Sequence, residues 1–224
     1  MSVKMFYSAE APIEALKGQK IAVIGYGSQG HAHARNLKES GLDVVVGLKE
    51  GSKSRAVAEG DGLKVASVAD AVKSADVVMI ATPDTGQKAL YERDIAPNLK
   101  PGTLLLFAHG FNIHFGRIAP AAGIDVGMVA PKGPGHLVRS VYVSGGGVPA
   151  LFAIHQDASG TARARVMAYA NGLGAGPVVS NPRTKVDSSH SPVSLLYAPP
   201  LLRVVTRPWE AYTVSSQPDE NPPA

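Results

Sequence analysis

The chain has 224 residues, 45% of them hydrophobic and none of them cysteine, so it can bury a sizeable core but forms no disulfide or thiolate zinc site. Its net charge is +4, but lysine and arginine are scattered, which argues against a nucleic-acid partner. Because no apolar run reaches about 18 residues and no leader precedes the first expected strand, we expect no membrane association and a cytoplasmic location.

Short apolar segments alternate with helical segments from residue 19 to about residue 172. Strands are expected at 21–25, 44–48, 63–66, 76–81, 103–107, 125–130 and 150–155. Helices are expected at 28–40, 53–59, 67–73, 85–95 and 159–171. This alternation predicts an α/β fold for residues 1–174, with a Rossmann-type, doubly wound and mostly parallel sheet.

The composition changes near residue 175. From Pro177 onward the chain holds nine of its 17 prolines and none of its 24 glycines. Proline at that density interrupts helices and central strands. Residues 175–224 are therefore predicted to form a proline-rich, largely irregular and disordered tail.

The first expected strand ends in a glycine-rich turn that opens a helix. Gly25, Gly27 and Gly30 have the G-x-G-x-x-G spacing of a dinucleotide-binding turn. They allow a tight turn, a close approach of the pyrophosphate and close packing of the helix on the strand. The other turn residues can contact phosphate or ribose: Tyr26, Ser28 and Gln29. The alternative is a glycine-rich turn that binds no ligand.

The residues after the second expected strand indicate which dinucleotide binds. NAD sites usually place a carboxylate there, which accepts a hydrogen bond from the ribose 2′-OH. Lys49 occupies this place, and Ser52 and Ser54 follow it. A cation and hydroxyl donors suit the 2′-phosphate of NADPH, which is the predicted cofactor. Glu50 is expected to point away, and a solvated loop is the alternative interpretation.

The strand at 76–81 is followed by a polar segment. In this architecture the carboxyl ends of parallel strands form the ligand crevice. We therefore predict that four consecutive residues contact the cofactor: Asp84, Thr85, Gly86 and Gln87. Asp84 can also cap the helix that follows.

Two later strands also end in candidate site residues. His109 follows the strand at 103–107 and can exchange a proton near neutral pH, although a lone histidine is more often structural. Lys132 follows the strand at 125–130, in a turn rich in glycine and proline. It could bind a carboxylate of a substrate or of a metal site, or belong to an ordinary loop.

Four segments together resemble the ketol-acid reductoisomerases, in the short form whose N-terminal domain binds NADPH. These segments are Gly25–Ala32, Phe107–Phe111, Ala130–His136 and Gln156–Gly160. The resemblance runs from about residue 6 to residue 174. It implies conversion of 2-acetolactate or 2-aceto-2-hydroxybutanoate into a 2,3-dihydroxy acid, a step of valine and isoleucine biosynthesis. In this family an alkyl group migrates with the help of two Mg²⁺ ions, and NADPH then reduces the ketone.

The resemblance makes His109 a catalytic position, and we also place Lys132 among the catalytic residues. It implies cofactor contacts at the residues named above and at Gly135. The family takes its Mg²⁺ ligands from a helical C-terminal domain, in which acids are spaced four residues apart. After residue 174 this chain has no two acids at that spacing, and we predict no metal ligand: its acids there are Asp187, Glu210, Asp219 and Glu220.

The resemblance stops abruptly at Ala175, as a frameshift or a fusion would make it stop. We therefore expect a truncated chain that binds NADPH but has little or no turnover by itself. Two further hypotheses follow. The chain could be a binding module that sequesters NADP(H) or associates with full-length subunits, or it could be a metal-independent NADP-dependent reductase.

Overall fold

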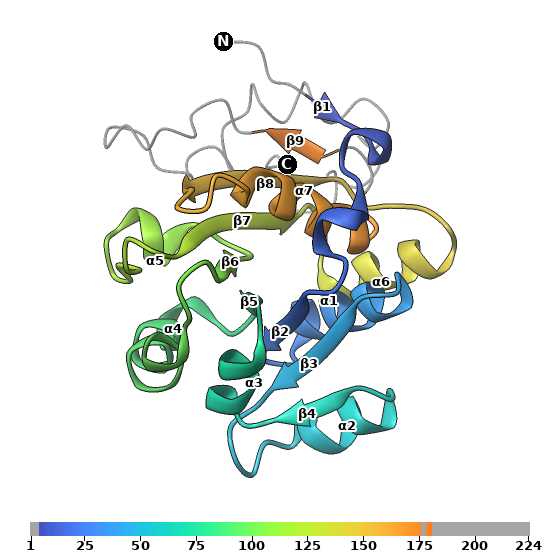
Figure 1. Cartoon of the computed structure of the whole chain (residues 1–224). Coiled ribbons are helices and arrows are strands. Elements are labelled where there is room, and N and C mark those ends of the chain that lie inside the picture. Colours follow the sequence, from blue (N-terminus) through green and yellow to red (C-terminus); the bar gives the residue numbers. More distant parts are fainter. Residues whose placement is uncertain (1–4, 176–177, 181–224) are drawn as a thin grey trace, which may run out of the picture. The chain divides into compact units, whose positions relative to one another are not determined.

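In the computed structural model, which describes residues 5–175 and 178–180, nine strands form one sheet. Their order is β1-β9-β8-β7-β6-β5-β2-β3-β4 (Figure 1). All described residues belong to one unit, residues 1–187, and the second unit, residues 188–224, lies outside them.

Six neighbouring strands form the parallel part of the sheet. They are β2 (Lys20–Ile24), β3 (Asp43–Gly47), β4 (Lys64–Ala66), β5 (Val77–Ile80), β6 (Leu104–Phe107) and β7 (Asp125–Pro131). The chain adds strands on one side of β2 and then crosses to begin again at β5. This is the switch point at which doubly wound sheets bind ligands. The predicted α/β, Rossmann-type and mostly parallel fold is confirmed.

Helices cover both faces of this sheet (Figure 1). One face packs against α1 (Ser28–Glu39), α2 (Ser54–Gly60), α6 (Gly135–Val143) and α7 (Ala162–Gly172). The other face packs against α3 (Val68–Ser74), α4 (Asp84–Leu90) and α5 (Phe111–His114). Strand β2 shows why both faces are covered, because Ile21 and Val23 point into one core and Ala22 and Ile24 into the other.

Three strands extend the sheet beyond β7. Strand β8 (Ala150–Gln156) is antiparallel to β7, β9 (Val178–Ser180) is parallel to β8, and β1 (Met5–Phe6) is antiparallel to β9. Strand β9 lies past residue 174, so the sheet includes three residues of the segment that was predicted to be an irregular tail. Residues 181–224 lie outside the described residues, and for them that prediction stays a prediction.

The short helix α5 was not predicted, and two further helical segments differ from the expected ones. The turn rich in glycine and proline continues into helix α6, which was not predicted; Pro134 is its N-cap. The helix expected at 85–95 is α4 followed by a π-helical turn, Tyr91–Ile95, and a 3₁₀ turn, Ala96–Asn98. Pro97 has no N–H, so the chain cannot continue there as a regular α-helix.

A buried ion pair holds the amino edge of the sheet. Asp125 is fully buried, and its carboxylate accepts hydrogen bonds from backbone N–H groups of residues 158–159 at 2.8 and 2.9 Å. Arg165 donates to the same carboxylate at 3.2 Å and to the carbonyl oxygens of Asp76 and Gly102 at 2.7 and 3.0 Å. The pair thus joins α7 to the start of β7 and to the loops that precede β5 and β6.

Helices α1 and α6 lie against each other along their length. At one end, a Cβ on Gly135 would overlap the backbone carbonyl oxygen of Ser28. Farther along, Arg139 donates to Asn36 and to Glu39, each at 2.8 Å. Because the start of α6 touches the start of α1, the turn that carries Lys132 is placed relative to the glycine turn.

We expect Asp125→Ala to lower the free energy of unfolding by about 3–5 kcal/mol, because it leaves the buried Arg165 guanidinium without its counter-ion. Asp43→Ala is the control, since Asp43 pairs with Lys20 at the surface and should change stability by less than about 1 kcal/mol. Urea titration followed by circular dichroism measures both. Equal losses in the two variants would contradict this role of Asp125.

Gly135→Ala should lower the free energy of unfolding by about 1–3 kcal/mol, because α6 must move away from α1 to admit the new methyl group. Gly60, in α2, has no atom within 4 Å of the position of a Cβ. Gly60→Ala should therefore be neutral or slightly stabilising. Thermal unfolding of the two variants side by side tests the contact, and a neutral Gly135→Ala would count against it.

Candidate functional site

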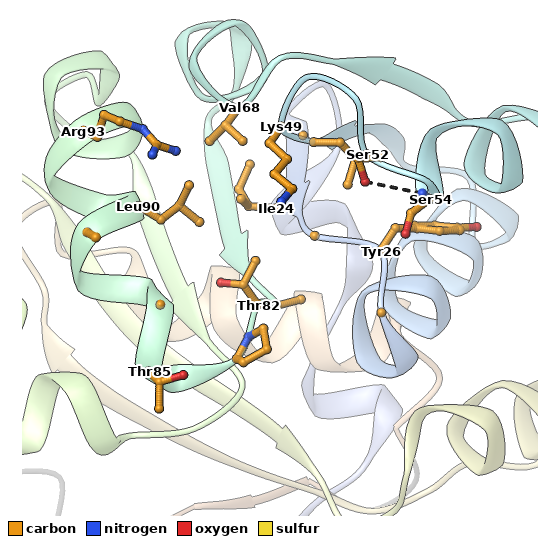
Figure 2. Close-up of a pocket in the computed structure, with 18 residues that line it drawn as sticks. Ile24, Tyr26, Lys49, Ser52, Ser54, Val68, Thr82, Thr85, Leu90 and Arg93 are labelled. Carbon is orange, nitrogen blue, oxygen red and sulfur yellow. Dashed lines mark hydrogen bonds between the residues drawn. The ribbon is translucent and has the colours of Figure 1, made fainter.

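A cavity of about 540 Å³ opens at the carboxyl ends of β2, β3 and β5 (Figure 2). Its lining begins with the last residues of these strands and the turns that follow them, at Gly25, Leu48 and Thr82. The cavity therefore lies at the switch point of the sheet, where this architecture binds its ligands.

The glycine turn forms one wall of the cavity. Gly25 has a φ of +99°, a conformation that favours glycine, and a Cβ there would come within 2.9 Å of Thr82. A Cβ on Gly30 would overlap the carbonyl oxygen of Gly25. At Gly27, by contrast, no heavy atom lies within 4 Å of where a Cβ would be. The backbone is open to a ligand at this point, and the free N–H groups of α1 begin there, so the turn fits a pyrophosphate.

The segment after β3 supplies a cation and two hydroxyls to the same cavity. Lys49, Ser52 and Ser54 all line it, and Figure 2 shows them together on the side of the glycine turn. The Ser54 N–H donates to the Ser52 oxygen at 3.3 Å. The Ser52 O–H is not used in this bond and can donate to a ligand. A cation with two hydroxyl donors can bind a phosphate group.

A hydrogen-bond network ties the glycine turn to the end of α2. The Tyr26 hydroxyl donates to Asp61 at 2.7 Å, and Arg35 donates to the other oxygen of the same carboxylate at 3.0 Å. Burial, followed by the hydrogen bond to Asp61, raises the pKa of Tyr26, so this hydroxyl remains a donor. The Tyr26 ring is thereby held in the cavity wall, and Arg35 balances the charge of Asp61.

The structure brings together eight of the fourteen residues predicted to contact the cofactor. The cavity is lined by Gly25, Tyr26, Gly27, Lys49, Ser52, Ser54, Thr85 and Gly86. The other six are not part of its lining: Ser28, Gln29, Gly30, Asp84, Gln87 and Gly135. Three of these six, Ser28, Gln29 and Gly135, lie where α1 meets α6, and Gln29 donates to the carbonyl oxygen of Gly133 at 2.9 Å.

The Gln87 side chain lies among protein groups. Its side chain is buried, donates to the carbonyl oxygen of Thr82 at 2.7 Å and accepts from Asn112 at 2.9 Å. Both ends of the amide are therefore used inside the protein. The sequence pattern did not reveal this, because the partner Asn112 follows a different strand.

The two predicted catalytic residues lie on the same edge of the sheet but outside the lining of the cavity. His109 follows β6, and its Nδ1 is 3.3 Å from the Asp84 carboxylate and accepts from the Phe111 N–H at 3.4 Å. Lys132 follows β7, and burial lowers its pKa to about 8. At pH 7 Lys132 is still mostly cationic and can bind a carboxylate.

Several lining residues were missed by the sequence reasoning. Thr82 has a buried hydroxyl that finds no partner among the described residues. Leu90 and Arg93 continue the helix face of Thr85 and Ala89 in steps of about four residues, a periodicity that could have revealed them. Val68, by contrast, arrives from α3 and carries no local signal.

Within residues 5–175 and 178–180, no three His, Asp or Glu side chains gather as metal ligands would. The described residues thus do not fit a metal centre. No helix in that part of the chain is both long and apolar enough to cross a membrane.

Comparison with known proteins places this geometry in a family. Residues 15–178 match the model of the acetohydroxy acid isomeroreductase NADPH-binding domain. The structure is similar to that of an NADH-preferring ketol-acid reductoisomerase from an uncultured archean, with a TM-score of 0.77 and 40% sequence identity. That match covers 80% of this chain and 56% of the other, so this chain spans little more than half of the length of that enzyme.

More distant structures share the fold alone. A semialdehyde dehydrogenase NAD-binding protein from Cupriavidus necator has a TM-score of 0.60 and 24% identity, covering 72% of this chain and 61% of its own. Pyrroline carboxylate reductase from Plasmodium falciparum, solved with NADP bound, has a TM-score of 0.57 and 15% identity, covering 74% and 58%.

The glycine turn, the cavity at the switch point and the family match over residues 15–178 agree with one another. The family match thus supports a nicotinamide dinucleotide as the cofactor of this chain. The chain belongs to the acetohydroxy acid isomeroreductase, or ketol-acid reductoisomerase, family and carries the domain that its family model describes as NADPH-binding.

Proposed function

We propose that this chain binds NADPH in preference to NADH. The observation that carries the proposal is the set of Lys49, Ser52 and Ser54, which line the cavity at the end of β3. Glu50 is exposed and does not line the cavity. The nearby Asp61 is held by Tyr26 and Arg35, so it is not available for a ribose 2′-OH.

The similar archean enzyme is described as NADH-preferring, so cofactor choice varies among proteins of this kind. The choice therefore has to be argued from the residues of this chain. A 2′-phosphate carries charge that a ribose hydroxyl lacks, and a cation with two hydroxyl donors stabilises that charge. These three side chains therefore favour the phosphorylated cofactor.

We further propose that the domain serves the ketol-acid reductoisomerase reaction, in which a 2-acetohydroxy acid such as 2-acetolactate becomes a 2,3-dihydroxy acid for valine and isoleucine biosynthesis. Bound NADPH would supply the hydride. The glycine turn would hold the pyrophosphate, and Lys132 would bind an anionic group of the substrate. His109, whose Nδ1 lies 3.3 Å from the Asp84 carboxylate, would hold or move a proton. No step is assigned to a metal, because the described residues do not fit one.

These 224 residues alone should have little or no turnover. The chain spans 56% of the similar enzyme, and its described residues offer no cluster of metal ligands. The alternatives remain a module that binds NADP(H), alone or together with full-length subunits, and a metal-independent reductase. The assays below distinguish them.

The cofactor preference predicts that the purified chain binds NADPH at least about tenfold more tightly than NADH. Replacing Lys49, Ser52 and Ser54 together by alanine should weaken NADPH binding by about 10- to 100-fold and leave NADH binding nearly unchanged. The control is Lys53→Ala, which removes an exposed cation of the same loop that does not line the cavity. Isothermal titration calorimetry measures all of these affinities, and equal wild-type affinities for NADPH and NADH would refute the preference.

A steady-state assay with 2-acetolactate, Mg²⁺ and NADPH should show no oxidation of NADPH above background. Turnover at the rate of an ordinary enzyme, about 1 s⁻¹ or more, would contradict the proposal that these 224 residues alone have little or no turnover. Reduction of simple 2-keto acids without Mg²⁺ would instead favour the metal-independent reductase. Repeating the assay with an intact family member tests whether the chain associates with full-length subunits.

A further inference from the structure

The cavity wall contains an arginine to which the proposed NADPH site assigns no role. Arg93 lies on the π-helical turn that continues α4, and it lines the cavity together with Leu90. Figure 2 shows Arg93, Leu90 and Thr85 along one helix, with the Arg93 guanidinium directed toward Val68 across the cavity.

The topology places Arg93 at the adenosine end of a bound dinucleotide. The π-helical turn packs against α3, which follows β4. Lys49 follows the neighbouring strand β3. The predicted catalytic residues, His109 and Lys132, follow β6 and β7, the parallel strands that lie farther from β3 in the sheet. If the nicotinamide faces those two residues, the adenosine half lies between Lys49 and Arg93.

The edge of the Arg93 guanidinium pairs with the neighbouring Asp94 carboxylate at the surface. Nε of Arg93 is 3.0 Å from both carboxylate oxygens of Asp94, and one terminal nitrogen is 2.6 Å from Oδ2. This pairing uses one edge of the guanidinium and neutralises part of its charge. Its flat faces stay exposed, and a planar guanidinium stacks well on aromatic rings.

The residues around Arg93 suit a flat ring better than a phosphate. Val68 lines the cavity and is 5% exposed, and Leu90 adds a further apolar side chain. An apolar surface beside a guanidinium suits a heteroaromatic base. The faces of such a base make apolar and cation–π contacts, and its edges can remain in contact with water.

We propose that Arg93, oriented by Asp94, is an adenine-binding residue whose guanidinium stacks on the adenine ring of the dinucleotide. The inference rests on the proposed dinucleotide function and adds an adenine subsite to it. Recognition at Arg93 would be indifferent to the 2′-phosphate, in contrast to recognition at Lys49. Arg93 would thus contribute affinity for the adenine ring of either cofactor, and Lys49 would contribute selectivity for NADPH.

Calorimetric titration of the full chain with NADPH, NADH and 2′,5′-ADP tests this division of roles. Arg93→Ala should weaken all three ligands by a similar factor of about 5- to 20-fold, as loss of a base-stacking contact does. Lys49→Ala should weaken NADPH and 2′,5′-ADP but not NADH. Arg93→Lys, which keeps the charge without the plane, should lose most of the same affinity.

The matched control is Lys88→Ala, which removes an exposed cation of the same helix that pairs with Glu92 and does not line the cavity. It should change no affinity. Unchanged binding by Arg93→Ala, full affinity in Arg93→Lys, or a loss confined to the two phosphorylated ligands would each overturn the stacking role. Failure of the wild-type chain to bind NADPH would overturn the proposed function itself.

Discussion

The close approach of backbone to backbone at three glycines determines how this domain is built. Gly30 lies against the carbonyl oxygen of Gly25, and Gly135 lies against that of Ser28, with no space for a Cβ at either contact. The first contact seats α1 on β2. The second seats α6 on α1. As a result, the glycine turn and the turn that carries Lys132 are positioned by the same helix.

Two polar networks add to these glycine contacts. Asp125 and Arg165 join the loops at the amino edge of the sheet, on the side away from the cavity. Near the cavity, Asp61 connects Tyr26 of the glycine turn to the end of α2. The glycine turn is therefore tied to the end of α2, the helix that follows the Lys49 segment. A turn that is held in place before a ligand arrives reduces the entropic cost of binding.

Local patterns predicted much of this arrangement, and long-range contacts were the part they could not predict. The glycine spacing and the Lys49 segment are local, and the structure places both at the cavity. Helix α6 was missed because Gly133, Pro134 and Gly135 are typical of a turn, and what stabilises α6 is its packing on α1. The burial of Gln87 could not be predicted from local patterns, because its partner Asn112 is 25 residues away in the chain. Strand β9 was missed because its pairing with β8 and β1 outweighs the proline content around it.

The central claim is that this chain holds a nicotinamide dinucleotide between the glycine turn and the α4 helix. Amide hydrogen exchange of the full chain, with and without saturating NADPH, tests it most directly. Binding should slow exchange at residues 25–30, 48–54 and 85–93, and leave the α7 segment, Ala162–Gly172, unchanged. No protection in those three segments, or protection confined to other parts of the chain, would contradict the account.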